Sequence, residues 1–368
     1  MSLFGRRTAA AVDVSVEEVR RAAGSVLDPE LQLTLEDAGM LGEVEVERGG
    51  RVQVTVRLTT ATCPMREQLV RQVGAAVRPL AGVTGVSVAV ESMTESERIS
   101  LATRLRGGRS SGHPFGPDSP TAVYAVASGK GGVGKSTVTA NLAVALARDG
   151  RRVGVLDADV WGYSVPQLFG VRQRPVALKG LMLPPRAHGV ALMSVGFLVE
   201  EDEPVVWRGP MLHKAIEQFL GDVHWGELDV LLVDLPPGTG DVTLSLLELL
   251  PDAQLLAVTT PQVAAQAVAT RVGRMARDVR MPVAGVVENM SGGLFGEGGG
   301  ARLAAAIDAP LLGQVPLDLP LRTAGDAGVP AVVAVPAAPS SVELSRIARE
   351  LPVVRRSLVG RSLPLSVV

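Results

Sequence analysis

The chain has 368 residues, enough for one large domain and a smaller one. A hydrophobic fraction of 46% with 20% charged residues is typical of a globular protein and excludes an intrinsically disordered chain. The net charge of -2 and the 3% of aromatic residues do not favour a nucleic-acid-binding protein, which needs basic surfaces and stacking rings, so no nucleic-acid partner is expected.

The sequence does not indicate export or membrane insertion. No apolar stretch approaches the roughly 20 residues of a membrane-spanning helix, and the first residues lack the apolar core of a secretory signal. A single cysteine excludes an intrachain disulfide, and the four histidines lack the spacing of a zinc site. A cytoplasmic protein with no membrane span is therefore expected.

Residues 1–92 are expected to form a small α/β domain. Ser15 and Glu18 have the spacing of a capping box, which predicts a helix to about Ala23. Alternating apolar residues on both sides of a Gly-Gly pair predict a β-hairpin, and a helix and a further strand follow it. The predicted hairpin strands are 44–47 and 52–58, the helix is 64–77 and the last strand is 86–90.

Cys63 lies immediately before the second predicted helix, with Pro64 at a position that suits the first helical turn. A thiol at a helix N-terminus is biased toward the thiolate, the form that binds metal or attacks electrophiles. The alternative is a small apolar residue packed under the helix. The physical chemistry of the sequence supports the two interpretations equally.

Residues 93–120 are expected to connect this domain to a second one at 121–368. The first part, 94–105, can form a short helix, whereas 106–120 is rich in Gly, Ser and Pro, which is typical of an exposed linker. After it, near-continuous apolar strands alternate with helical patterns and predict an α/β fold, a mainly parallel sheet between helices. The predicted strands are 123–127, 153–156, 191–195, 230–233, 255–258, 283–287 and 311–315, and the helices are 138–148, 212–220, 242–250, 262–278 and 301–307.

A glycine-rich loop joins the first of these strands to the first of these helices. Gly129–Ser136 fits the phosphate-loop pattern G-x-x-x-x-G-K-[ST] in full. Its backbone N–H groups are expected to form a nest for the phosphates of a nucleotide, helped by the positive end of the following helix. Lys135 is expected to reach the β- and γ-phosphates, and Ser136 to ligate Mg²⁺. The residues expected to bind the nucleotide here are Gly129, Lys130, Gly131, Gly132, Val133, Gly134, Lys135, Ser136 and Thr137.

Lys130 is a second lysine, near the start of the loop. The pattern K-G-G-x-G-K-[ST] resembles the deviant phosphate loop of the superfamily of the nitrogenase iron protein, MinD and ParA. The resemblance implies that Lys130 crosses the interface of a homodimer to the partner's nucleotide. The alternative is a solvated surface lysine.

Carboxylates close two further predicted strands. Asp234 ends an apolar strand, where it can hold Mg²⁺, and Gly238 lies in a following loop able to approach a γ-phosphate. Asp157 and Asp159 close another strand, and phosphoryl transfer needs a group that orients the attacking water. We expect Asp159 to orient the water and Asp157 to give structural or metal support. The predicted catalytic residues are Lys130, Lys135, Asp159 and Asp234.

Two residues after the last predicted strands are candidates for the base site. Asn289 has the donor and the acceptor needed to read a purine edge. Pro316 is placed to flank the base. All these residues follow strands, and ligands of parallel sheets bind at the carboxyl ends of the strands.

The N-terminal segment carries a resemblance of its own. Asp28-Pro29-Glu30-Leu31, with the later L-T-x-x-x-C-P that contains Cys63, resembles the small domain of iron–sulfur assembly factors of the SufT and PaaD kind. The resemblance implies that the cysteine is the functional centre, and so favours Cys63 as a ligand of an iron–sulfur cluster such as [4Fe-4S].

The larger domain closely resembles the Mrp/ApbC family over about 123–330. The resemblance rests on S-G-K-G-G-V-G-K-S-T, V-L-D-A-D-V-W-G-Y-S-V-P, W-G-E-L-D-V-L-L-V-D-L-P-P-G-T-G-D, V-T-T-P-Q, G-V-V-E-N-M-S and F-G-E-G-G-G. It implies an ATPase that carries an iron–sulfur cluster and transfers it to apoproteins, with ATP and Mg²⁺ bound. The implied partners are a second copy of the chain, apoprotein clients and assembly factors.

The chain departs from the family in two places. The family has a C-x-x-C between E-N-M-S and F-G-x-G-G-G, through which two subunits share a cluster, whereas here Ser291 leads through Gly292-Gly293-Leu294 directly to Phe295. Iron–sulfur clusters require thiolate ligands in most cases, so a dimer would have to use two Cys63 thiolates, or a small thiol or client would have to complete the set. The second departure is Val263, where many relatives have aspartate.

Two other functions remain open at this level. A spatial organiser like MinD or ParA would need an amphipathic membrane helix or a DNA-binding surface; the tail after Ser340 is basic, but Pro352 and Pro364 interrupt it and it shows no clean apolar face. The missing cysteines support a nucleotide-gated scaffold that binds no cluster.

Overall fold

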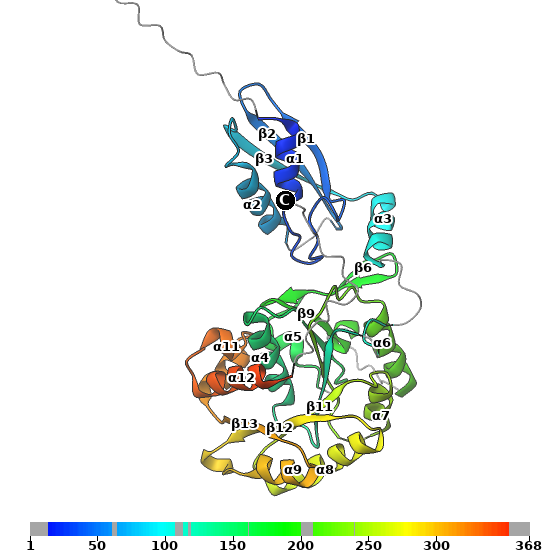
Figure 1. Ribbon diagram of the computed structural model, residues 1–368, viewed down its shortest axis with the longest axis vertical. Coiled ribbons are helices and arrows are strands. Elements are labelled where there is room, and N and C mark those ends of the chain that lie inside the picture. Colours follow the sequence, from blue (N-terminus) through cyan, green and yellow to red (C-terminus); the bar gives the residue numbers. More distant parts are fainter. Residues whose placement is uncertain are drawn as a thin grey trace, which may run out of the picture. The chain divides into compact units, whose positions relative to one another are not determined.

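The structure is a computed structural model, described here for residues 14–60, 65–106, 113–116, 119–160, 162–199, 209–238 and 240–352 (Figure 1). Contacts divide the chain into two compact units. Unit 1 is Met1–Ser110 with Ala177–Leu183, and unit 2 is Ser111–Val176 with Pro184–Val368.

Unit 1 contains the predicted three-stranded sheet and two helices, together with a third helix and a separate two-stranded hairpin. Ser15 and Glu18 form the expected capping box at the start of α1, with the Ser15 hydroxyl accepting a hydrogen bond from the Glu18 N–H. β1 and β2 pair antiparallel as the predicted hairpin, and β3 pairs parallel to β2. The core of the unit includes the alternate, buried residues Val52, Val54, Val56 and Leu58 of β2. The elements are α1 (Val16–Gly24), β1 (Leu41–Val46), β2 (Arg51–Leu58), α2 (Arg66–Val77), β3 (Gly85–Ser92) and α3 (Glu95–Arg106), with the hairpin β6 (Val176–Leu178) and β7 (Leu181–Leu183).

Unit 2 is an eight-stranded sheet in the order β13-β12-β11-β4-β10-β5-β9-β8. All neighbours pair parallel except β8, which is antiparallel to β9 at one edge. The seven predicted strands are confirmed. Their observed bounds are β4 (Ala122–Ser128), β5 (Val153–Asp157), β9 (Val190–Ser194), β10 (Val230–Asp234), β11 (Gln254–Thr259), β12 (Val283–Ser291) and β13 (Leu311–Pro316), and β8 is Arg186–Ala187.

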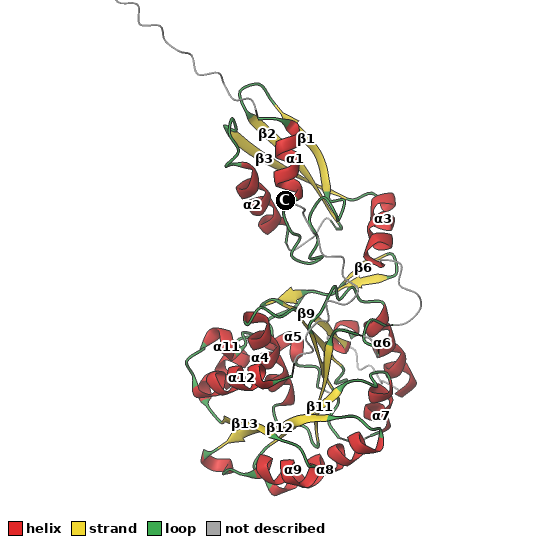
Figure 2. Ribbon diagram, in the orientation of Figure 1, coloured by secondary structure: helices red, strands yellow, loops and turns green. Residues whose placement is uncertain are grey.

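Helices cover both faces of this sheet (Figure 2). Successive side chains of β12 point to opposite faces of the sheet, and both faces are apolar. Val287 packs in the core under α4 and α12, whereas Val286 packs with Ile307 of α9 on the other face. The predicted helices are α4 (Lys135–Arg148), α6 (Gly209–Gly221), α7 (Asp241–Glu248), α8 (Val263–Asp278) and α9 (Gly299–Ile307). The helices not predicted are α5 (Val165–Leu168), α10 (Leu319–Asp326), α11 (Ala331–Ala334) and α12 (Pro339–Glu350), with 3₁₀ turns at Val195–Leu198 and Gly293–Phe295.

The structure corrects one expectation about the tail. Residues after Ser340 were expected to lack a clean apolar face, but α12 buries Leu344, Ile347 and Ala348 against the core that it shares with α4. Ser340 and Ser341 are also fully buried, so small polar residues complete the buried face and hide it from a hydropathy pattern. None of the helices in the described ranges is long and apolar enough to cross a bilayer.

Candidate functional site

The glycine-rich loop runs from the end of β4 to the start of α4, as predicted. Gly132 and Gly134 have φ values of 78° and 79°, in a left-handed region that residues other than glycine rarely adopt. A Cβ at Gly134 would also overlap the Nδ2 of Asn289. A pocket opens over the loop, lined by Ser128, Lys130–Thr137, Asp159, Gly162, Ser164 and Pro237.

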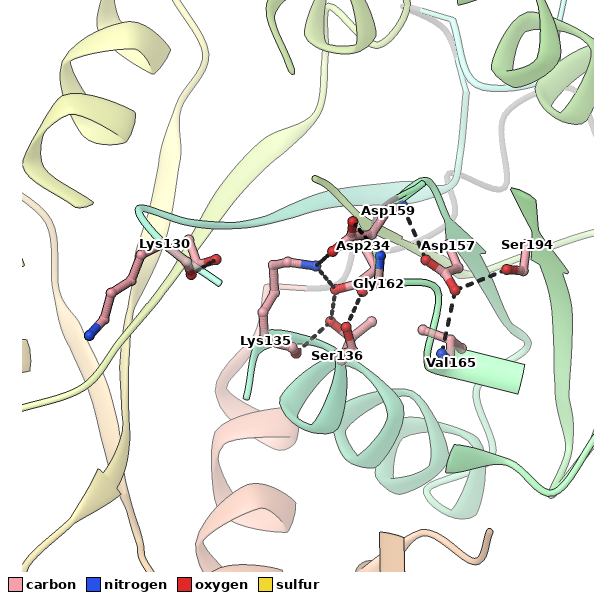
Figure 3. Close-up of polar contacts among 11 residues, drawn as sticks. Lys130, Lys135, Ser136, Asp157, Asp159, Gly162, Val165, Ser194 and Asp234 are labelled. Atoms are coloured by element: carbon pink, nitrogen blue, oxygen red, sulfur yellow. Dashed lines mark hydrogen bonds and ion pairs between the residues drawn. The ribbon is translucent and has the colours of Figure 1, made fainter. Parts of the chain in front are cut away.

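Strand register brings two of the predicted carboxylates side by side at the edge of the sheet that carries the phosphate loop. Asp234 on β10 is the register partner of Asp157 on β5, which in turn is the partner of Ser194 on β9. Because these strands are parallel, their carboxyl ends lie at the same edge of the sheet. Residues far apart in the sequence therefore form one polar cluster at the phosphate loop (Figure 3).

Lys135 and Asp234 form the centre of the cluster. The Lys135 ammonium lies 2.8 Å from Oδ1 of Asp234 and 3.8 Å from Oδ2 of Asp159, and the Lys135 side chain is only 5% exposed. The Lys135 Nζ nevertheless makes no directed hydrogen bond, so it presents buried donors that a phosphate would satisfy. The Ser136 hydroxyl donates to Oδ2 of Asp234 at 2.5 Å, which places the two oxygens predicted to hold Mg²⁺ side by side.

Asp157 holds the neighbouring loop. Its carboxylate accepts hydrogen bonds from the Ser194 hydroxyl at 2.9 Å and from the Asp159 and Val165 N–H groups at 3.2 and 3.4 Å. Burial, with the nearby charge of Asp234, raises the pKa of Asp157 to about 8, although Lys135 opposes the shift. These contacts favour the structural part of the predicted role of Asp157.

Asp159 follows at the edge of the pocket, where its Oδ1 accepts a hydrogen bond from the Gly162 N–H at 3.2 Å. Gly238 is placed differently from its predicted role. It has a φ of 94°, as a tight loop requires, but its N–H donates to the Ser128 carbonyl at 2.9 Å instead of facing the pocket. Pro237, its neighbour, lines the phosphate pocket.

Lys130 points away from Lys135 (Figure 3). Its ammonium donates to Oε1 of Gln262 at 3.0 Å, an exposed contact at the start of α8. The two lysines of the loop therefore occupy different environments: one is buried over the phosphate nest and one is at the surface.

A second pocket adjoins the first and shares Gly134, Thr137 and Ser164 with it. The structure brings Asn289 and Pro316 together in its lining, as predicted from the ends of β12 and β13. Asn289 Nδ2 donates to the Val133 carbonyl at 2.9 Å, whereas its buried Oδ1 accepts no hydrogen bond. α5 and α10 supply the opposite wall, with Gln167, Leu168, Leu321, Arg322, Gly325 and Asp326.

The candidate cluster ligand, Cys63, lies outside the described residues. The segment that departs from the Mrp/ApbC pattern is described: Gly293–Phe295 form a short 3₁₀ turn and Leu294 is 90% exposed. Within the described ranges, His, Asp and Glu side chains form no group of three or more that could hold a metal ion.

Sequence reasoning missed several polar residues of the site. Thr139 donates to Oδ1 of Asp234 at 2.9 Å, Ser194 anchors Asp157, and Gln262 holds Lys130. Glu288 is buried beside Asn289; burial opposes its charge, but hydrogen bonds from the Gly300 N–H, Ser291, Gln314 and the Gly298 N–H outweigh burial and lower its pKa. The helical spacing of Thr139 from Lys135 was an available signal, whereas the contacts of Ser194 with Asp157 and of Gln262 with Lys130 join segments distant in sequence.

Comparisons with known proteins agree with this geometry. A family model described as NUBPL iron-transfer P-loop NTPase matches residues 119–352, and one described as iron-sulfur cluster assembly protein matches residues 16–90. Proteins called iron-sulfur cluster carrier protein from Mycobacterium leprae and Bacillus subtilis are 48% and 40% identical to the chain. Their alignments cover 94% and 83% of this chain, and 95% and 88% of the relatives.

Solved structures match unit 2 in fold. A nucleotide-binding protein from Archaeoglobus fulgidus in complex with ADP is 38% identical, with a TM-score of 0.50, over 57% of this chain and 87% of its own. The cell division ATPase MinD of Pyrococcus furiosus, 24% identical with a TM-score of 0.50, covers 62% of this chain and 97% of its own, a likeness of fold alone.

Proposed function

The chain belongs to the NUBPL-type family of iron-transfer P-loop NTPases, with an N-terminal iron-sulfur cluster assembly domain, and we propose that it is an ATP-hydrolysing carrier that delivers iron–sulfur clusters to apoproteins in the cytoplasm. The observation that carries the proposal is the presence, in one chain, of a phosphate-loop pocket and an assembly-type domain. We assign the assembly domain to 1–92, the linker to 93–120 and the ATPase domain to 121–368.

Unsatisfied polar atoms support ATP as the nucleotide. The buried Lys135 donors match the β- and γ-phosphates, and Ser136 with Asp234 would hold Mg²⁺. Asn289 Oδ1 is a buried acceptor without a donor, and the exocyclic amine of adenine supplies one. Guanine presents a carbonyl oxygen at the corresponding position and would leave Oδ1 unsatisfied.

The proposed hydrolysis uses residues already at the pocket. Asp159 orients a water toward the γ-phosphorus; a bond forms between that water oxygen and phosphorus, and the bond from the γ-phosphorus to the β–γ bridging oxygen breaks. The proton lost by the attacking water passes to a phosphate oxygen, and the products are ADP and inorganic phosphate. Lys135 stabilises the negative charge on the transferred group because it is held in a buried site of low dielectric constant. Bound Mg²⁺ would supply further charge stabilisation at the phosphates.

The chain has one cysteine, so a cluster bound to it needs thiolates from other molecules. We propose that Cys63 is a cluster ligand, with the remaining thiolates supplied by Cys63 of a second copy, by a small thiol or by the client. A homodimer also suits Lys130, which lines the pocket but whose ammonium points away from Lys135 and donates to Gln262.

Anaerobic reconstitution with iron and sulfide tests the carrier function. The wild-type chain should develop the visible absorbance of a thiolate-bound cluster, and Cys63→Ser should not. Lys135→Ala is the matched control, because it should lose ATP hydrolysis and keep cluster binding. If the wild type binds no cluster, or Cys63→Ser binds as well, the chain is not a carrier, and a nucleotide-gated scaffold becomes the better description.

A further inference from the structure

Strand β3 is an unprotected edge of the unit 1 sheet. The order β1-β2-β3 leaves one side of its eight residues without a strand partner in the described chain. Edges are usually blocked by lysine, proline or a bulge, because free N–H and C=O groups invite another strand. The opposite edge is modified in that way: β1 has a register irregularity between Leu41 and Val44 and carries Glu43 and Glu45. β3 contains no lysine, proline or register irregularity, and its one charged side chain, Glu91, lies 3.9 Å from Arg57 of β2.

The side of β3 that faces α2 is also incompletely covered. Val88 and Val90 pair in register with Val54 and Val56 of β2, which are at most 1% exposed. Val88 and Val90 themselves are only half-buried. The helices therefore cover the middle of the sheet and leave an apolar strip along the edge strand.

A groove between α2 and β3 contains this strip. It is lined by Arg66, Glu67, Val70, Arg71, Val88 and Val90, and we refer to it as the edge groove. Its floor is valine and its rim carries two arginines against one glutamate. Arg66 forms no ion pair with any described residue, and Arg71 lies 3.6 Å from Glu67 in a pair whose side chains are 70% and 89% exposed, which binds weakly. The groove thus presents net positive charge beside apolar surface.

We propose that the edge groove binds an extended client segment, which adds as a fourth strand beside β3. Main-chain hydrogen bonds would satisfy the free edge, and alternate side chains would face α2. Apolar residues among these would cover Val88 and Val90, and acidic residues would pair with Arg66 and Arg71. The identity of the occupant as an apoprotein rests on the proposed carrier function. Arg66 follows Cys63 by three positions, so the segment would bind close in sequence to the proposed cluster ligand.

A designed peptide tests the chemistry of the groove. We would use a fluorescent peptide of about ten residues in which every second residue is Thr and the others alternate Val and Asp. The full chain, without nucleotide or cluster, should bind it by fluorescence anisotropy. The double variant Arg66→Glu/Arg71→Glu should bind about tenfold or more weakly and should prefer the same peptide with Lys in place of Asp. The exposed pair Arg274→Glu/Arg277→Glu on α8 is the matched control and should leave binding unchanged.

Backbone methylation tests the strand addition. N-methyl groups on alternate amides block one hydrogen-bonding edge of an extended peptide. One methylation register should therefore abolish binding and the other should retain it. Absence of binding, equal effects of both registers, or no effect of the Arg66 and Arg71 reversal would overturn the proposal.

Two further outcomes are separable from these. If sedimentation shows that the chain dimerises through this edge and the arginine reversal abolishes the dimer, the occupant is a second copy and the proposal is wrong. Cluster reconstitution on Cys63 does not depend on Arg66 or Arg71. If the chain binds no peptide but reconstitutes a cluster normally, only the proposal for the edge groove is wrong. If it binds the peptide but no cluster, the proposed carrier function is wrong.

Discussion

Lys135 shows how one side chain can be held ready for a ligand. It is buried beside Asp234 but makes no directed hydrogen bond, so its interaction with the protein is incomplete. We expect Lys135→Ala to lower the rate of ATP hydrolysis at least a hundredfold, because the charge that stabilises the transferred phosphoryl group is lost. A phosphate-release assay would measure this rate. The exposed Lys214→Ala is the control, and an equal loss there would show that the effect is not specific to the site.

Substitution of Asn289 tests how the pocket recognises the base. Its unsatisfied Oδ1 favours a purine with an amine at the 6-position, as in adenine, so Asn289→Ala should weaken ATP binding by about 1–3 kcal/mol and affect GTP much less. Titration calorimetry with both nucleotides measures the ratio. An unchanged preference for ATP over GTP would mean that another residue of the pocket selects the base.

Asp157 predicts a dependence of stability on pH. Its pKa is raised to about 8 by burial and by the charge of Asp234, so the folded chain retains a proton that the unfolded chain releases near its ordinary value of 3.8. Its stabilising contribution is therefore complete below that ordinary value and is lost as the pH rises toward 8. In urea, without nucleotide or metal, the free energy of unfolding should fall on the order of 1 kcal/mol per pH unit between pH 6 and 8. Asp157→Asn should lack this part of the slope; parallel curves for the two proteins would contradict the assignment.

The sequence identified site residues at the ends of strands, but not the residues whose hydrogen bonds fix the positions of those side chains. Lys135, Ser136, Asp234 and Asn289 could be predicted because a motif or a strand end marks each of them. Ser194 could not, because its contact with Asp157 exists only through the register of β5 and β9. Hydrogen bonds across a sheet depend on strand order, which an unaligned sequence does not contain.

At the scale of elements, the conformation of the phosphate loop requires glycine at position 134 but not at position 131. Gly134 has a φ of 79° and lies against Asn289, whereas Gly131 has open space where a Cβ would be and no positive φ. Gly134→Ala should lower the free energy of unfolding by more than about 1 kcal/mol, from backbone strain and displacement of Asn289. Gly131→Ala should change it by less than about 0.5 kcal/mol. Equal urea midpoints for the two variants would contradict this account.

Elements with a clear apolar pattern were predictable, and elements without one were not. Each of the seven parallel strands contains an apolar run, which is a strong signal, and each predicted helix of unit 2 follows one of these strands in the chain. α5 and α11 are four residues each, too short for a helical period to be visible. α10 and α12 begin beside prolines and bury small residues, so their patterns resemble loops although their packing is that of core helices.

For the whole molecule, the different environments of Lys130 and Lys135 suggest that a single chain lacks part of its own site. Lys130 is held by Gln262 at the surface, and an exposed contact of this kind is worth at most about 1 kcal/mol. A partner's nucleotide could therefore displace it at little cost. Under the dimer proposal, Lys130→Ala should bind ATP nearly normally and be as stable as the wild type, yet hydrolyse ATP slowly.

Mixing two inactive variants distinguishes this arrangement from an action of Lys130 on its own nucleotide. Lys130→Ala retains Asp159, and Asp159→Asn retains Lys130, so a mixed dimer has one site with both residues only if Lys130 acts across the interface. Because random pairing makes half of the dimers mixed, each with one of two sites complete, an equal mixture should recover about one quarter of the wild-type rate. A rate no higher than the mean of the two variants alone would place the action of Lys130 within its own chain, and the dimer would then no longer be needed to complete the site.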